Sequence, residues 1–137
     1  ATTLRGTAAL KLTGSGDYTI DEEITQTVSG GTAKGRVVSW DSTNGILKYF
    51  QSPDLHTHNG KVLAFDHATN NVTGATSSTA RPIDGNQDTA LADISFTDGK
   101  ANPEIAPNSG DIVYIENRRQ ITRAADQIED IKLVIEF

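Results

Sequence analysis

Short runs of alternating apolar and polar residues, separated by turns that contain glycine and asparagine, make up most of this chain. A period of two is typical of a half-buried strand, because successive side chains of a strand point to opposite faces of the sheet. The pattern predicts strands at residues 7–12, 23–28, 35–41, 46–51, 61–65 and 90–96. Many short strands with frequent turns favour an all-β fold, either an antiparallel β-sandwich or a small barrel.

The clearest local prediction is a β-hairpin around residues 42–45, where Asn-Gly favours the positive φ angles of a hairpin turn. We expect Val38 and Trp40 to share one face, with Leu47 and Tyr49 as their cross-strand partners and mutual burial as the outcome. The alternative is that Trp40 or Tyr49 is exposed. An exposed aromatic ring on a sheet would provide a stacking platform for a sugar, as in a carbohydrate-binding module.

Residues 66–87 lack any apolar periodicity and are rich in Thr, Ser, Asn and Gly. A segment of this length and composition predicts a long irregular surface excursion, ordered by a partner if it is ordered at all. The strand at residues 90–96 follows it, and Pro103 and Pro107 predict an extended connection beyond that strand.

The last stretch, residues 111–137, predicts a strand, a tight charged corner and a final strand. Four apolar residues of the final strand share one face by alternation: Ile131, Leu133, Ile135 and Phe137. This strand–corner–strand unit completes the expected all-β architecture at the C-terminal end.

Length and composition agree with one β-rich domain over residues 1–137. Only 36% of the residues are hydrophobic, and the 12 glycines suit a fold with many turns better than a helix bundle. The chain contains no methionine, even at its first position, so we expect it to be the C-terminal part of a longer protein.

The formal net charge of −6 argues against nucleic acid as a partner, because phosphate binding requires clustered Lys and Arg. No segment approaches the ~20 apolar residues that cross a bilayer, so no membrane partner is expected. The absence of cysteine excludes disulfides and thiolate metal sites, and it is compatible with assembly in a reducing cytoplasm.

Candidate chemistry is sparse. His56 and His58 lie two positions apart and form a weak metal-site candidate, to which Asp54, Asp66 or His67 could add a third ligand. The alternative is a pair of solvated loop histidines. The chain has no recognisable nucleophile motif or phosphate-binding loop, so we expect no enzymatic activity and no cofactor.

The terminal stretch carries a spaced motif: Tyr114-x-Glu116-Asn117-Arg118, then Ile121, then Asp126-Gln127-x-Glu129-x-Ile131, with Phe137 at the end. This motif resembles the C-terminal part of the baseplate wedge proteins of T4-like contractile-tailed phages. In that family a proline commonly follows the Asn-Arg pair, whereas this chain has Arg119 and Gln120.

The resemblance implies a structural protein of the virion tail baseplate, assembled in the host cytoplasm. Its implied partners are other wedge proteins and a second copy of itself, and its implied work is subunit–subunit assembly in the contractile tail. We expect seven motif residues to stabilise the terminal corner and contribute to an interface: Tyr114, Glu116, Asn117, Arg118, Asp126, Gln127 and Glu129. Two alternatives are a capsid decoration protein and a carbohydrate-binding β module.

Overall fold

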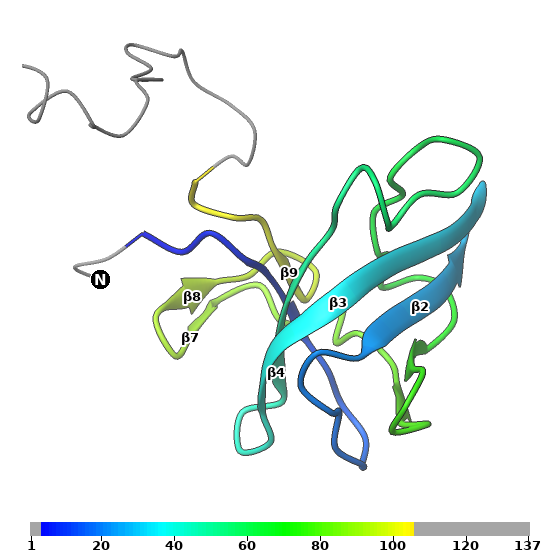
Figure 1. Ribbon diagram of the computed structural model, residues 1–137. Coiled ribbons are helices and arrows are strands. Elements are labelled where there is room, and N and C mark those ends of the chain that lie inside the picture. Colours follow the sequence, from blue (N-terminus) through cyan, green and yellow to red (C-terminus); the bar gives the residue numbers. More distant parts are fainter. Residues whose placement is uncertain (1–3, 106–137) are drawn as a thin grey trace, which may run out of the picture. The chain divides into compact units, whose positions relative to one another are not determined.

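The computed structural model describes residues 4–105, which fold into strands and loops without any helix (Figure 1). The strands are β1 (Ala8–Lys11), β2 (Glu23–Val28), β3 (Gly31–Asp41), β4 (Ile46–Phe50), β5 (Val72–Gly74), β6 (Ala80–Arg81), β7 (Ala90–Leu91), β8 (Ile94–Ser95) and β9 (Lys100–Ala101). Within residues 4–105 there is no helix that is long and apolar enough to cross a membrane. The predicted all-β class is therefore confirmed.

Seven strands form one antiparallel sheet in the order β6-β5-β2-β3-β4-β1-β9, and β7 pairs with β8 in a small second sheet. The long strand β3 lies at the centre, between β2 and β4 (Figure 1). An isolated bridge joins Leu12, just after β1, to Ile83, just after β6. The large sheet curls enough to bring these positions together, but its strands do not close into a barrel.

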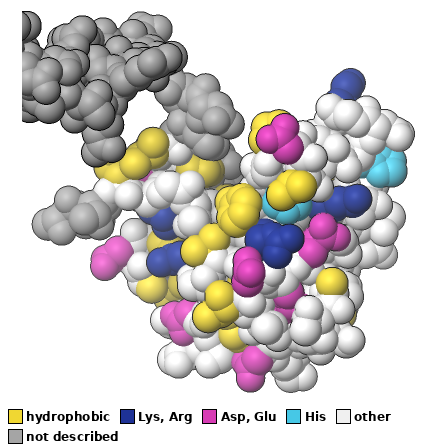
Figure 2. Space-filling model, in the orientation of Figure 1, with side chains coloured by type: hydrophobic (Ala, Val, Ile, Leu, Met, Phe, Trp, Pro, Cys, Tyr) yellow, Lys and Arg dark blue, Asp and Glu magenta, His cyan; other side chains and the backbone are white. Residues whose placement is uncertain are grey.

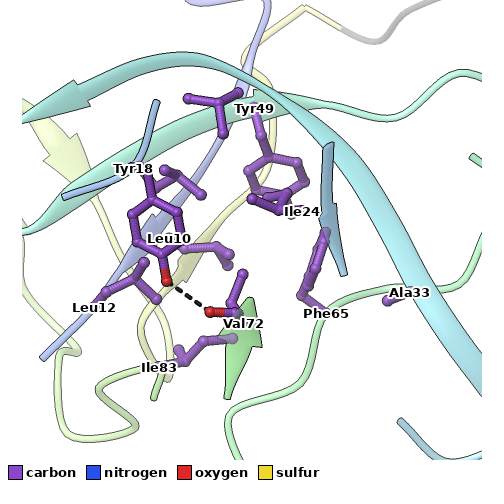
Figure 3. Close-up of a cluster of buried hydrophobic side chains, with 11 residues drawn as sticks. Leu10, Leu12, Tyr18, Ile24, Ala33, Tyr49, Phe65, Val72 and Ile83 are labelled. Atoms are coloured by element: carbon purple, nitrogen blue, oxygen red, sulfur yellow. Dashed lines mark hydrogen bonds between the residues drawn. The ribbon is translucent and has the colours of Figure 1, made fainter. Parts of the chain in front are cut away.

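The curled sheet encloses the main core (Figure 3). It is built from alternate residues of several strands together with loop residues: Leu10, Leu12, Tyr18, Ile24, Ala33, Val37, Leu47, Tyr49, Phe65, Val72 and Ile83. The Tyr18 hydroxyl donates a hydrogen bond of 2.7 Å to the Val72 carbonyl oxygen, so its polar end is satisfied inside the core. Burial raises the pKa of Tyr18 to about 12.

The opposite faces of β1 and β4 are also covered at one end. Ala9 and Ile46 pack there with Ile94, Phe96 and Ala101 in a second buried cluster. The small β7–β8 sheet supplies Ile94 to this cluster. Two neighbouring strands of the large sheet therefore have apolar contacts on both faces.

Residues 90–96 do not form the single strand predicted from their alternation. They form the β7–β8 hairpin, in which Leu91 pairs with Ile94 across a two-residue turn. Both turn residues, Ala92 and Asp93, have positive φ angles, of 50° and 63°. This geometry is a two-residue hairpin turn of the kind that Asn-Gly normally occupies, and the sequence Ala-Asp gave no signal for it.

Replacing the two turn residues with their preferred types is expected to stabilise the protein. Alanine has no side-chain group to compensate for the left-handed backbone, which costs about 1 kcal/mol. We expect Ala92→Asn combined with Asp93→Gly to raise the free energy of unfolding by about 1 kcal/mol, measured by urea denaturation. Ala90→Asn, which lies in β7 outside the turn, is the control. An unchanged or lower free energy of unfolding in the double variant would refute the strain argument.

The β3–β4 hairpin is confirmed, but its turn and register differ from the prediction. Gly45 has a φ of 67°, whereas Asn44 is not among the residues with positive φ. Trp40 pairs with Leu47 as expected, but a β-bulge between Val37 and Ser39 shifts the register, so that Tyr49 pairs with Val37 instead of Val38. The extra residue reverses the alternation along β3. The prediction that Val38 shares a face with Trp40 is therefore wrong: Val38 points away from the core.

Residues 66–87 were predicted as an irregular surface excursion, and the structure corrects this. They contain β5 and β6, and β5 extends the large sheet by pairing with β2. Val72 and Ile83 are buried in the main core. A few apolar residues at the right positions are enough to anchor this segment, because backbone pairing with β2 supplies the remaining order.

Residues 61–65 were predicted to return as a strand. They make only an isolated bridge between His58 and Lys61 and otherwise have no ladder. Phe65 at the end of this segment is nonetheless buried and contacts Tyr49 edge-to-face. The apolar residues of this segment thus indicate contact with the core, and not pairing with another strand.

Candidate interaction surface

The residues of the terminal motif lie outside the residues that the structure describes: Tyr114, Glu116, Asn117, Arg118, Asp126, Gln127 and Glu129. Their expected corner and interface roles remain predictions. The surface described below therefore belongs to residues 4–105.

His56 and His58 do not assemble a metal-binding set with their neighbours. Among residues 4–105 no group of three or more His, Cys, Asp or Glu side chains could hold a metal ion. The ring of His56 is fully buried, and its Nδ1 accepts a 2.7 Å hydrogen bond from the backbone N–H of Ser52. The ring of His58 lies against Gly31. The alternative of two solvated loop histidines is therefore wrong for His56.

Trp40 and Tyr49 do not form an exposed platform for a sugar. The indole N–H of Trp40 donates to the Asp17 carboxylate at 2.9 Å, and its ring packs edge-to-face on Tyr18. The Arg81 guanidinium lies over the same ring, 4.7 Å from its centroid, in a cation–π contact. Tyr49 is buried in the main core. These contacts show that Trp40 and Tyr49 pack within the fold.

Exposed apolar side chains lie on the face of β3 and β4 that is turned away from the core. Val38 is 41% exposed and Phe50 is 40% exposed. They are diagonal neighbours, because Phe50 pairs with Arg36, two residues before Val38. Leu55, 64% exposed, lies in the loop that follows β4. We call Val38, Phe50 and Leu55 the outer surface. Figure 2 shows one face of the molecule, on which apolar side chains lie interspersed with charged ones.

Charges of both signs border the outer surface. Arg36 lies 3.6 Å from the Asp21 carboxylate and also donates a 2.7 Å hydrogen bond to the Asp21 carbonyl oxygen. Lys48 pairs with Ser39 on the same hairpin, beyond the bulge. Because Asp21 is paired with Arg36, the named charges at this border are not a cluster of free cations of the kind that nucleic acid requires. Its mixture of apolar centre and polar margin is typical of a protein–protein interface.

The loop that carries Leu55 is held to the sheet by buried polar contacts. The Gln51 side-chain amide donates to the carbonyl oxygens of Lys34 and Leu63, at 2.8 and 2.7 Å. The ring of His56 packs edge-to-face on Phe50, with centroids 5.6 Å apart. Leu55 therefore lies in an anchored loop whose next residue, His56, contacts Phe50, and this anchoring reduces the entropy lost when a partner binds.

A second anchored loop follows β5 on the other side of β2, and no local pattern predicts it. The buried Glu22 carboxylate accepts backbone hydrogen bonds from Thr19 at 2.7 Å and from Thr76 and Ser77 at 2.8 Å each. The Ser77 hydroxyl adds a fourth bond at 2.8 Å. Burial by itself raises the pKa of Glu22, but the hydrogen bonds from Ser77, Thr19 and Thr76 outweigh it and hold the pKa below its ordinary value of 4.5.

A shallow polar groove of about 670 Å³ lies where residues 69–71 pass β2 and β5. Threonine hydroxyls and asparagine amides line most of it: Thr25, Thr27, Thr69, Asn70, Asn71 and Thr73. Gln26 holds this loop by donating to the carbonyl oxygens of Asp66 and Asn70, at 2.7 and 2.6 Å. The groove has no charged lining residue and no aromatic ring, so it offers neutral hydrogen bonding only.

Sequence reasoning missed Phe50, Glu22 and the burial of His56. Alternation along β4 carried a signal for Phe50, since Tyr49 in the core requires its neighbour to point outward. Glu22 lies in a run of three acidic residues whose last member is the first residue of the strand at residues 23–28. Nothing local could have distinguished it from Asp21 and Glu23, because its partners Thr76 and Ser77 are more than fifty positions away.

The comparisons with known proteins agree with the terminal motif. A sequence model of the family described as Bacteriophage T4, Gp8 matches residues 60–137. A search of curated proteins finds no match, and a search of solved structures finds none. The match supports a location in the tail baseplate of the virion. Because it covers more than half of the chain, this protein belongs to the phage Gp8 family and is a structural, T4-like baseplate wedge protein.

Proposed function

We propose that this protein joins neighbouring subunits of the baseplate wedge in a contractile tail, and that the outer surface is one of its contact sites. The observation that supports this proposal is the exposure of Val38, Phe50 and Leu55 on an anchored hairpin and loop. Exposed large apolar residues that lie close together on a rigid face mark interaction sites in soluble proteins. The family supplies the partner class, namely other baseplate proteins.

The proposal extends to oligomeric state and assembly. The protein forms a homodimer and is incorporated into the wedge in the host cytoplasm, before the tail is complete. The chain contains no cysteine, which is compatible with assembly under reducing conditions. The terminal motif residues stabilise the C-terminal corner through charge-assisted hydrogen bonds, chiefly from Arg118, and contribute a further part of the interface.

Contacts between wedge subunits that bear mechanical load must bury a large surface area. A stable protein–protein interface buries at least ~1,000 Å² in total, which is more than three side chains can supply. The outer surface is therefore the apolar centre of a larger contact. A charged substitution at that centre removes apolar burial and also places an unpaired charge against the partner.

Phe50→Asp is expected to weaken the association with baseplate partners by at least about tenfold, which corresponds to ~1.4 kcal/mol. The measurement is the affinity of purified protein for wedge proteins from the same phage, by isothermal calorimetry. Leu4→Asp is the matched control, because Leu4 is 71% exposed and lies outside the outer surface. Equal affinities for Phe50→Asp and wild type would remove the outer surface from the proposal.

Cross-linking of native virions tests the wider function. Lys48 lies on β4, two residues before Phe50, so an amine-reactive cross-linker at Lys48 should join this protein to other baseplate proteins. Links from Lys61, Lys100 and Lys132 would identify further neighbours. Links to the major capsid protein alone would contradict a role in the wedge.

A further inference from the structure

The loop at residues 51–60 is closed around a buried histidine. The backbone of Ser52 is bonded at both ends to His56: its N–H donates to the ring Nδ1 at 2.7 Å, and its carbonyl oxygen accepts from the His56 N–H at 2.9 Å. The ring is 0% exposed and stacks edge-to-face on Phe50. The imidazole of His56 is therefore one of the contacts that hold the loop in the conformation that presents Leu55.

The hydrogen bond from Ser52 determines which protonation state the loop accepts. A nitrogen that accepts a hydrogen bond carries a lone pair, so Nδ1 is unprotonated and the proton of the neutral ring is on Nε2. Nε2 is buried and has no hydrogen-bond partner. A second proton on Nδ1 would face the Ser52 N–H, which is itself a donor, and this contact would break.

The surroundings of the ring also disfavour a positive charge. Burial lowers the pKa of His56 below its ordinary value of 6.5. Among the charged groups around the ring, Glu23 on β2 favours the protonated form, while Lys34 and Arg36 on β3 oppose it. Phe50 on β4 is uncharged, and the exposed Asp54 is the nearest acid within the loop itself. Burial is the largest of these influences, and together with the two cations it outweighs Glu23, so the ring favours the neutral form.

We propose that His56 is an acid-sensitive latch: the neutral ring holds residues 51–60 closed, and protonation of Nδ1 releases the loop. Release displaces Leu55 and removes the ring that packs on Phe50, so the latch controls the shape of the outer surface. This consequence for assembly rests on the proposed function, whereas the latch itself does not.

The sign of the pH dependence follows from the lowered pKa. Above pH ~6.5 the ring is neutral in both the closed and the open loop, and the closed state has its full stability. Below pH ~6.5 the open loop takes up the proton first, so the equilibrium moves towards opening as the pH falls. The ratio of open to closed loop rises by at most about tenfold per pH unit, until His56 in the closed loop is itself protonated.

Amide hydrogen exchange on the 137-residue chain tests the latch. Protection of residues 52–58, corrected for intrinsic exchange rates, is expected to fall up to about tenfold between pH 7 and pH 5.5. Protection of the β2–β3 ladder should not change over this range. Constant protection of the loop down to pH 5 would overturn the proposal.

Two asparagine variants separate the latch from general acid effects. In His56→Asn the side-chain oxygen can accept the Ser52 N–H but does not titrate, so loop protection should become independent of pH. His58→Asn replaces the neighbouring, half-exposed histidine and should keep the wild-type response. A pH response that persists in His56→Asn, or disappears in His58→Asn, would assign it to another group.

A measurement on the wild type guards against a variant that fails to fold. The ring of His56 is titrated by proton–nitrogen NMR, and the midpoint of loop opening is compared with the ring titration. Coinciding midpoints support the latch, and a loop midpoint near pH 4 would assign opening to carboxylates. Calorimetric binding at pH 7 and pH 5.5 then tests the assembly role separately: an operating latch with unchanged affinity would contradict only the proposed function of the outer surface.

Discussion

Glu22→Gln is expected to lower the free energy of unfolding by about 3 kcal/mol. Both carboxylate oxygens accept hydrogen bonds from donors: Thr19 and the Ser77 hydroxyl at one oxygen, Thr76 and Ser77 backbone at the other. A glutamine amide places its own N–H₂ against one of these donor pairs and leaves them unsatisfied in a buried site. Urea denaturation at pH 7 measures the loss.

Glu23→Gln is the matched control for this substitution. Glu23 is the next residue along the chain and accepts no side-chain hydrogen bond within residues 4–105. We expect its free energy of unfolding to stay within about 0.5 kcal/mol of the wild type. Similar losses in both variants would show that the carboxylate cage around Glu22 adds little to stability.

Protonation of the Glu22 carboxylate is expected to lower the free energy of unfolding at acidic pH. The pKa of Glu22 is lower in the folded protein than its ordinary value of 4.5, so the unfolded chain binds the proton first as the pH falls. The stabilisation is fully present above pH ~4.5 and is lost as the pH falls through the folded-state pKa. The free energy of unfolding should therefore fall less between pH 6 and pH 3 in Glu22→Gln than in the wild type.

The second large effect is expected for Gly99→Ala, with a loss of about 3 kcal/mol in the free energy of unfolding. Gly99 has a φ of 75°, and its carbonyl oxygen accepts the Lys11 N–H at 2.8 Å. A Cβ atom here would overlap the Asp84 carbonyl oxygen and lie 2.7 Å from Ile83 Cγ2. Since part of this overlap is with backbone, the clash cannot be relieved by rotating a side chain.

Gly30→Ala separates backbone strain from steric overlap. Gly30 also has a positive φ, of 95°, but a Cβ atom there would have no neighbour within 4 Å. This variant should lose only about 1 kcal/mol, the cost of the left-handed conformation. Thermal unfolding of both variants gives the comparison, and equal losses would mean that the contact at Gly99 relaxes without cost.

Local pattern was sufficient where partners are close in sequence. The strands at residues 8–11 and 23–28 and the β3–β4 hairpin follow from alternation and turn residues, because strand preference and hairpin closure are set by nearby residues. Local pattern failed at the β7–β8 turn, where Ala92 and Asp93 adopt a geometry that their types do not favour. Burial of the second apolar cluster compensates for that local cost.

Prediction of the candidate surface was less complete. Alternation would place Phe50 outside the core once Tyr49 is inside. The bulge after Val37, which lets Trp40 face the core, has no signature in the sequence. The spacing of His56 and His58 suggested a metal site. In the structure His56 is instead buried, and its ring packs against Phe50. The terminal motif lies outside the described residues, so its seven residues remain a prediction.

The sequence alone thus determined the all-β class and, through its terminal motif, the family, because both rest on the order and spacing of nearby residues. The tertiary structure decided which polar groups are buried and which apolar groups are exposed. Glu22 bonds to Thr76 and Ser77, and Gln26 bonds to Asp66 and Asn70, with partners forty or more positions apart in the sequence. Such contacts form only when the curled sheet brings distant loops together, and no local pattern encodes that approach.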